Sequence, residues 1–141
     1  MMFLLIDDDS DDRVLFREAL QEVSPDTICA TESDGRKALS NLFNLTTQLP
    51  DVIFVDINMP KISGWDCLTQ IKSQEKTKDI PVFMYSTSSN DRDIEKASNC
   101  GAACLITKPE DFTELKRWLA EVIKLLEDKA SFPIGFANYT F

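Results

Sequence analysis

The sequence predicts a doubly wound, three-layer α/β fold around a five-stranded parallel sheet, and two observations lead to this prediction. First, its short apolar runs are continuous rather than alternating, which is typical of strands covered on both faces. Second, amphipathic segments alternate strictly with these runs and are long enough to be crossover helices. The apolar runs cover residues 3–6, 27–30, 52–55, 82–85 and 103–106.

Five segments have the signals of amphipathic helices, at residues 10–23, 36–44, 65–72, 91–100 and 111–128. The buried face of the first is predicted to contain Val14, Ala19, Leu20 and Val23. The last has the clearest apolar stripe, formed by Leu115, Leu119, Val122 and Leu126. Trp65 and Trp118 lie on such stripes and are expected in the core or at its edge. Glycine at position 101 suits the end of the fourth helix.

Composition bounds the function of this 141-residue chain. A net charge of −9 argues against direct nucleic-acid binding, which depends on lysine and arginine. The absence of histidine excludes histidine-based acid/base catalysis and histidine-containing zinc sites. The cysteines include no CxxC pair and are expected to be reduced thiols: Cys29, Cys67, Cys100 and Cys104. With no targeting segment and no membrane span, a cytoplasmic protein is expected.

Polar residues directly follow four of the five apolar runs. Asp7 and Asp8 follow the first run, Asp56 the third, Ser86 and Thr87 the fourth, and Lys108 the fifth. In a parallel sheet all these positions lie outside the carboxyl ends of the strands, where such folds bind ligands. Acids at the end of a buried strand are costly unless they are paired or metal-bound. The pattern therefore predicts a functional site at this edge.

Physical chemistry indicates what this set of side chains can do. Three converging carboxylates repel one another unless a cation compensates, and Mg²⁺ prefers such oxygen ligands while leaving positions for phosphate oxygens. With the metal and Lys108 beside it, the Asp56 carboxylate could attack a phosphorus atom, because the developing charge is already matched. The product would be an aspartyl phosphate.

These residues resemble the receiver domain of bacterial two-component response regulators, over roughly residues 2–127. The motifs that carry the resemblance are the acid pair in 5–8, the 55–60 loop with Gly64, the Ser86 hydroxyl, Gly101-Ala102 and Lys108-Pro109. The resemblance implies a flavodoxin-like strand order, 2-1-3-4-5. It also implies a cytoplasmic, chemotaxis-regulator-like phosphoprotein that is not a conventional enzyme.

The resemblance assigns roles to individual residues. Asp56 is the phosphoacceptor, and Asp7, Asp8 or both hold Mg²⁺ with Asp56 and the main-chain carbonyl of Asn58. Lys108 binds the phosphoryl group and Ser86 hydrogen-bonds to it. Thr87 competes for the hydroxyl role, but spacing from Pro81 favours Ser86 and leaves Thr87 as a small neighbour. The phosphoryl donor is a histidine on a separate sensor kinase or phosphotransfer protein.

Other acids and two departures from the family pattern lead to further expectations. Asp9, Asp11 and Asp12 are expected to be solvated, with Asp9 or Ser10 capping the first helix. Leu105 stands where the family usually has its switch aromatic, and Glu110 where it usually has phenylalanine. Both departures concern the usual output rather than the phosphorylation chemistry.

The chain is expected to be one receiver domain, residues 1–129, with a short aromatic tail, 130–141, and no separate output domain. The tail is expected to pack on the domain or to form a dimer contact. Output would pass through an effector protein, a homodimer or a phosphorelay, and the sequence does not separate these. The alternatives are a haloacid-dehalogenase-like phosphohydrolase, disfavoured because the nucleophile follows the third run, and a degenerate pseudo-receiver, disfavoured because every phosphorylation residue is present.

Overall fold

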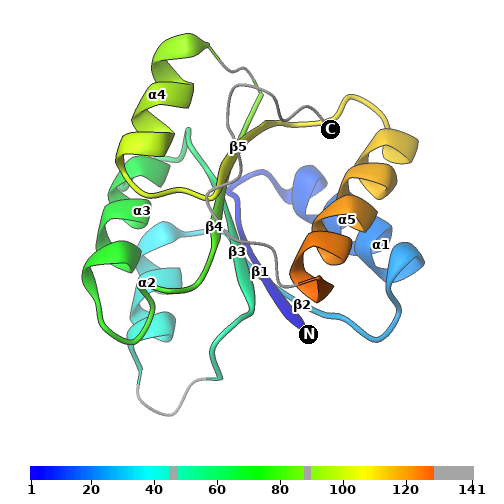
Figure 1. Ribbon diagram of the computed structural model, residues 1–141, viewed down its shortest axis with the longest axis horizontal. Helices are drawn as coiled ribbons and strands as arrows, with labels where there is room; N and C mark the ends of the chain where they lie inside the picture. The colour runs from blue at the N-terminus through cyan, green and yellow to red at the C-terminus, as the bar shows by residue number, and fades with distance from the viewer. Residues whose placement is uncertain (45–47, 88–89, 129–141) are drawn as a thin grey trace.

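A computed structural model describes residues 1–44, 48–87 and 90–128. Within these residues five strands alternate with five helices (Figure 1). The strands are β1 (Met2–Ile6), β2 (Ile28–Glu32), β3 (Val52–Asp56), β4 (Val82–Ser86) and β5 (Cys104–Thr107). The helices are α1 (Ser10–Val23), α2 (Gly35–Phe43), α3 (Gly64–Ser73), α4 (Asp91–Asn99) and α5 (Phe112–Glu127).

The strands form one sheet in the order β2-β1-β3-β4-β5, and every neighbouring pair is parallel. Helices α1 and α5 cover one face of the sheet, and α2, α3 and α4 cover the other (Figure 1). The three-layer fold and the strand order are therefore confirmed. Because all strands run the same way, their carboxyl ends meet at one edge.

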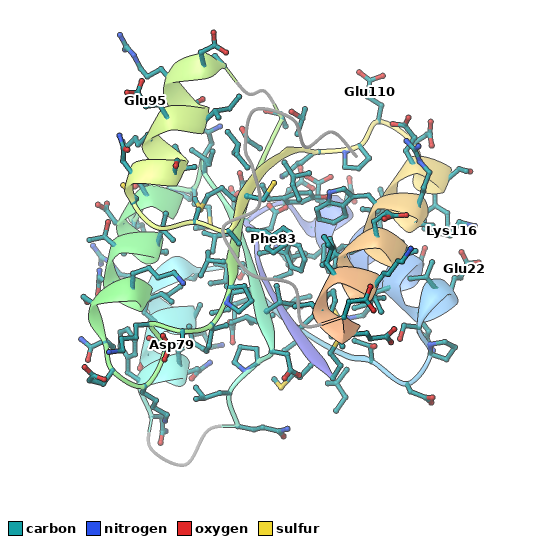
Figure 2. The ribbon with its side chains drawn as sticks, in the orientation of Figure 1. Glu22, Asp79, Phe83, Glu95, Glu110 and Lys116 are labelled. Carbon is teal, nitrogen blue, oxygen red and sulfur yellow. The ribbon has the colours of Figure 1, made fainter. Side chains whose placement is uncertain are left out.

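The two faces of the sheet have different cores. Under α1 and α5 the core is aromatic: the Phe54 ring lies 5.1 Å from Phe16 and 5.3 Å from Trp118, centroid to centroid. Phe83 lies at the centre of the molecule in Figure 2 and belongs to the same cluster. Under α2, α3 and α4 the core is mainly aliphatic. The prediction that the tryptophans are core or core-edge residues is confirmed, since Trp118 is buried and Trp65 packs partly buried against the second core.

An ion pair joins the two helices on the aromatic face at their surface. Lys116 Nζ on α5 lies 3.4 Å from Glu22 Oε2 on α1. The two residues are labelled near each other in Figure 2. Both side chains are partly exposed, so solvent screens their attraction and the pair contributes little to stability.

The prediction for the first helix was wrong at one position. Val14 is exposed, whereas Phe16, Ala19 and Leu20 are the buried residues of α1. Residues three and four apart share a helix face, so Phe16, Ala19 and Leu20 are buried together. Val14 lies two residues before Phe16, about 200° around the helix from it, and therefore faces solvent. The second strand also begins one residue later and extends two residues further than the apolar run at 27–30. It is an edge strand whose faces are only partly covered, so it can end in the polar residues Thr31 and Glu32.

All four cysteines are free, with Cys67 and Cys104 buried and the other two half-buried. No helix of the described residues is both long enough and apolar enough to cross a membrane. The aromatic tail at 130–141 lies outside the described residues.

Candidate phosphorylation site at the carboxyl edge of the sheet

Two of the predicted acids are buried at the carboxyl edge of the central strands. Asp7 follows β1 and is completely buried, and Asp56 ends β3 with 6% of its surface exposed. Asp8, the next residue along, is exposed. One carboxylate oxygen from each of the three lies within 4.8 Å of the others. The sheet therefore brings together the three acids that the sequence predicted.

Lys108 supplies the positive charge of this centre. Its ammonium Nζ lies 2.8 Å from Asp12 Oδ2, 2.9 Å from Asp7 Oδ2 and 3.4 Å from Asp56 Oδ2. It also lies 5.1 Å from the centroid of the Tyr85 ring, which places it over an aromatic face. Three carboxylates, from the loop after β1, the first turn of α1 and the end of β3, thus share one ammonium group.

Backbone groups fix the two buried carboxylates in place. The Asp9 N–H donates to Asp7 Oδ1 at 3.0 Å, and the Asn58 N–H donates to Asp56 Oδ1 at 3.1 Å. The Arg13 guanidinium donates to the main-chain carbonyl of Asp7 at 2.8 Å. Because each buried carboxylate has one oxygen occupied by its own loop, its other oxygen is the one turned to Lys108.

Gly64 lets α3 begin directly behind β3, the strand that ends in Asp56. A Cβ atom at this position would lie 2.3 Å from the Asp56 carbonyl oxygen and 2.7 Å from Ile57 Cα. The Gly64 N–H also donates to the Ile57 carbonyl at 3.0 Å. Only a residue without a side chain allows the loop after Asp56 to fold back so closely.

The electrostatics of the centre follow from burial and from these contacts. Burial raises the pKa of Asp56 from 3.8 to about 7; the charge of Lys108 opposes this shift, and that of Asp7 adds to it. Burial alone would lower the pKa of Lys108, but its hydrogen bonds to Asp12 and Asp7 more than compensate and raise the pKa above its usual 10.5. Lys108 is therefore a permanent cation, while Asp56 titrates near neutrality.

The hydroxyl candidates lie at the end of β4, beside Lys108. Ser86 is buried, and its carbonyl accepts the Lys108 N–H at 2.6 Å, which ties the ends of β4 and β5 together. Thr87 is exposed and lines an open cavity of about 520 Å³ over the acidic centre. The other residues around the cavity are Asp8, Asp9, Ser10, Asp12, Asp56, Asn58 and Lys108.

Two expectations about the neighbouring acids have different outcomes. Asp9 caps α1, with its side chain accepting the N–H groups of Asp11 and Asp12, so the first of the two proposed capping residues is correct. The prediction that Asp12 is merely solvated was wrong, because it makes the shortest of the three contacts to Lys108. The sequence places Asp12 only in the first turn of a helix that begins at the site, and this position alone does not specify a contact with Lys108.

The arrangement suits a hard divalent cation. Asp7, Asp8 and Asp56 offer only oxygen ligands, and two of the three are buried acids with a single lysine to compensate them. Such a donor set fits Mg²⁺ or Mn²⁺ and does not fit a metal that prefers nitrogen or sulfur. A fold and site of this kind define a parallel α/β protein with an acidic, lysine-bearing centre at its carboxyl edge.

Comparison with known proteins identifies the family. The response regulator receiver domain matches residues 3–120, and the chain belongs to this family. The probable methanogenesis regulatory protein FilR2 of Methanothrix harundinacea is 29% identical over 86% of this chain and 80% of its own length. Other relatives are longer, and the chain spans 33% and 15% of two of them.

Solved structures agree with this assignment. The phosphorylated cyanobacterial phytochrome response regulator RcpA matches with a TM-score of 0.82 and 30% identity, over 94% of this chain and 98% of its own. The Mn²⁺-bound form of response regulator Rcp1 matches with a TM-score of 0.79 and 26% identity, over 94% and 99% of the two chains. Receiver domains as a family are signalling modules that are phosphorylated by histidine kinases and bind Mg²⁺ at their acidic pocket.

Proposed function

We propose that this chain is a phosphorylation switch that accepts a phosphoryl group on Asp56. The observation that carries the proposal is the convergence of Asp7, Asp8 and Asp56, with oxygens within 4.8 Å of one another, beside the Lys108 ammonium 3.4 Å from Asp56. The receiver domain covers residues 1–129 in this proposal, and signalling passes through protein–protein contacts. The aspartyl phosphate, rather than turnover of a substrate, is the functional product.

The proposed reaction transfers a phosphoryl group from a phosphohistidine of a sensor kinase or phosphotransfer protein. An Asp56 carboxylate oxygen forms the new O–P bond as the donor's P–N bond breaks, and the electron pair of that bond stays on the donor's ring nitrogen. Lys108 and the Ser86 hydroxyl are the groups proposed to engage the phosphoryl oxygens. Thr87 is the small neighbour that leaves room for them in the cavity.

Mg²⁺ is the proposed cofactor, held by Asp7, Asp8, Asp56 and the main-chain carbonyl of Asn58. When bound, it would neutralise charge that develops on the transferred group. The chain's own residues perform the rest: the Asn58 and Asp9 amides orient the two buried carboxylates, and Lys108 holds a fixed positive charge beside the acceptor. The Mn²⁺-bound relative supports a divalent cation of this size.

The test of the acceptor is incubation with acetyl phosphate and Mg²⁺, followed by intact-mass measurement. The wild-type protein should gain the mass of one phosphoryl group, and Asp56→Asn should gain none. A matched control is Asp51→Asn, which changes an exposed acid just before the opposite end of the same strand and should label normally. Labelling of Asp56→Asn at the wild-type level would show that another residue is the acceptor.

A further inference from the structure

Asp12 has no place in the reaction described above, yet it makes the closest contact to the lysine of the site. It lies in the first turn of α1, and its Oδ2 is 2.8 Å from Lys108 Nζ, compared with 3.4 Å for Asp56. Its side chain is 30% exposed, whereas those of Asp7 and Asp56 are 0% and 8% exposed. Asp12 is therefore the one partner of Lys108 that can turn into water at little cost.

The donor capacity of Lys108 makes these contacts competitive. An ammonium group has three N–H donors, and the three carboxylates of Asp7, Asp12 and Asp56 account for all of them. A phosphoryl group on Asp56 adds further negative charge and acceptor oxygens within the same cavity, which Asp12 also lines. Lys108 can engage that group only by releasing one of its present partners.

We propose that Asp12 is a positioning residue that competes with the phosphoryl group for Lys108. It holds the ammonium toward α1 while Asp56 is unmodified, and phosphorylation displaces it into solvent. This inference rests on the proposed phosphorylation of Asp56 and adds a residue that sets how strongly the phosphorylated state is favoured. The exchange also transmits the modification to the first turn of α1, where Asp12 lies.

The test compares the affinity for beryllofluoride, a phosphoryl mimic, at saturating Mg²⁺, followed by tryptophan fluorescence or NMR. Both Asp12→Asn and Asp12→Ala should bind it about fivefold more tightly than wild type, the size of one partly screened charge interaction. Asp12→Glu retains a carboxylate that can reach Lys108 and should return the affinity to within about twofold of wild type. Asp11→Asn is the matched control: it removes the same charge one residue away, and its carboxylate makes no contact with Lys108 among those found in the described residues.

Unchanged or weaker binding by the two neutral variants would overturn the proposal, as would equal tightening in Asp11→Asn, which would indicate a general charge effect. Failure of the Glu variant to restore the wild-type affinity would also contradict it. If wild type itself binds no beryllofluoride, the proposed function is wrong and this inference falls with it. A crystal structure of the beryllofluoride complex provides an independent test. The Lys108 ammonium should contact a fluoride of the bound group, and the Asp12 carboxylate should lie beyond ion-pair distance from it.

Discussion

At the scale of single residues, the burial of Asp56 links metal binding to pH. Its pKa is raised to about 7, and a protonated carboxyl group is a poor ligand for Mg²⁺. The proton and the metal therefore compete, and Mg²⁺ should bind about tenfold more weakly at pH 6 than at pH 8, as expected for one competing proton. Calorimetric titration with MgCl₂ across this range measures the effect. A dissociation constant independent of pH would contradict the raised pKa.

The raised pKa of Asp56 also predicts how the free energy of unfolding changes with pH in the absence of metal. The unfolded chain titrates Asp56 near 3.8 and the folded protein near 7, so the folded state binds the proton more tightly. The contribution of Asp56 to the free energy of unfolding is thus present below about pH 4 and is lost as pH rises to about 7. Urea unfolding in EDTA should show this decline in wild type. In Asp56→Asn the decline over this interval should be smaller, and an equal decline would assign it to other groups.

The site residues that could be predicted from the sequence are those that directly follow a strand along the chain. Asp7, Asp8, Asp56 and Lys108 directly follow apolar runs, so a parallel sheet alone brings them together. The contact of Asp12 with Lys108 depends instead on how α1 is oriented on the sheet, 96 residues away in sequence from its partner. Packing of Phe16 sets that orientation, and no local pattern reports it.

At the scale of secondary-structure elements, the close approach of α3 to the end of β3 makes Gly64 critical. In Gly64→Ala the new Cβ would meet backbone atoms of Asp56 and Ile57, which cannot move without displacing the Asp56 carboxylate. We expect a loss of about 1–3 kcal/mol in the free energy of unfolding and weaker Mg²⁺ binding. Urea denaturation and calorimetry measure the two effects.

Gly101 provides the matched control for this substitution. Its φ of 88° makes alanine strained there, but the nearest atoms to a new Cβ belong to the Lys72 side chain, 3.7 Å away. Gly101→Ala should therefore lower stability and leave Mg²⁺ affinity unchanged. If both variants bind Mg²⁺ as wild type does, the close contact at Gly64 does not position the loop that follows Asp56.

The element boundaries show why some of the fold was predictable and some was not. Helices α1 and α5 begin or end within one residue of the sequence prediction, because capping acids and apolar stripes mark their limits. The exposure of Val14 could not be predicted from the apolar pattern of α1, because one helical face contains Val14 and an overlapping face contains Phe16. Only contact with Phe54 and Trp118 selects the face that contains Phe16.

The ends of β4 and β5 form the element through which a modification at Asp56 can spread. The 2.6 Å hydrogen bond from the Lys108 N–H to the Ser86 carbonyl couples them, and the Lys108 ammonium lies 3.4 Å from Asp56 Oδ2. Ser86→Ala should therefore still permit phosphorylation but reduce the change that beryllofluoride produces in amide hydrogen exchange across residues 90–110. Leu105 has no aromatic ring, so we expect the Ser86 end of β4 to carry more of the coupling. An equal change in mutant and wild type would exclude this route.

At the scale of the whole molecule, the acidic centre lies in a chain that already carries a net charge of −9. Asp7, Asp8 and Asp56 repel one another in the folded state and separate on unfolding, so an ion that binds them favours the folded state. By mass action, Mg²⁺ at about 100 times its dissociation constant should add roughly 2.7 kcal/mol to the free energy of unfolding. Urea denaturation with and without MgCl₂, at ionic strength matched with NaCl, measures this gain.

The variants that separate a specific site from general charge screening are a pair of neighbouring acids. Asp8→Asn removes one of the three converging carboxylates and should reduce the response to Mg²⁺, whereas Asp11→Asn removes an equal charge from outside that cluster and should retain it. Both variants lower the net negative charge by one, so a screening effect would change equally in each. Because screening depends on the charge of the whole molecule and site binding on three oxygens within 4.8 Å, only a site predicts a difference between them. Equal responses in the two variants would mean that Mg²⁺ stabilises the fold without occupying the predicted centre.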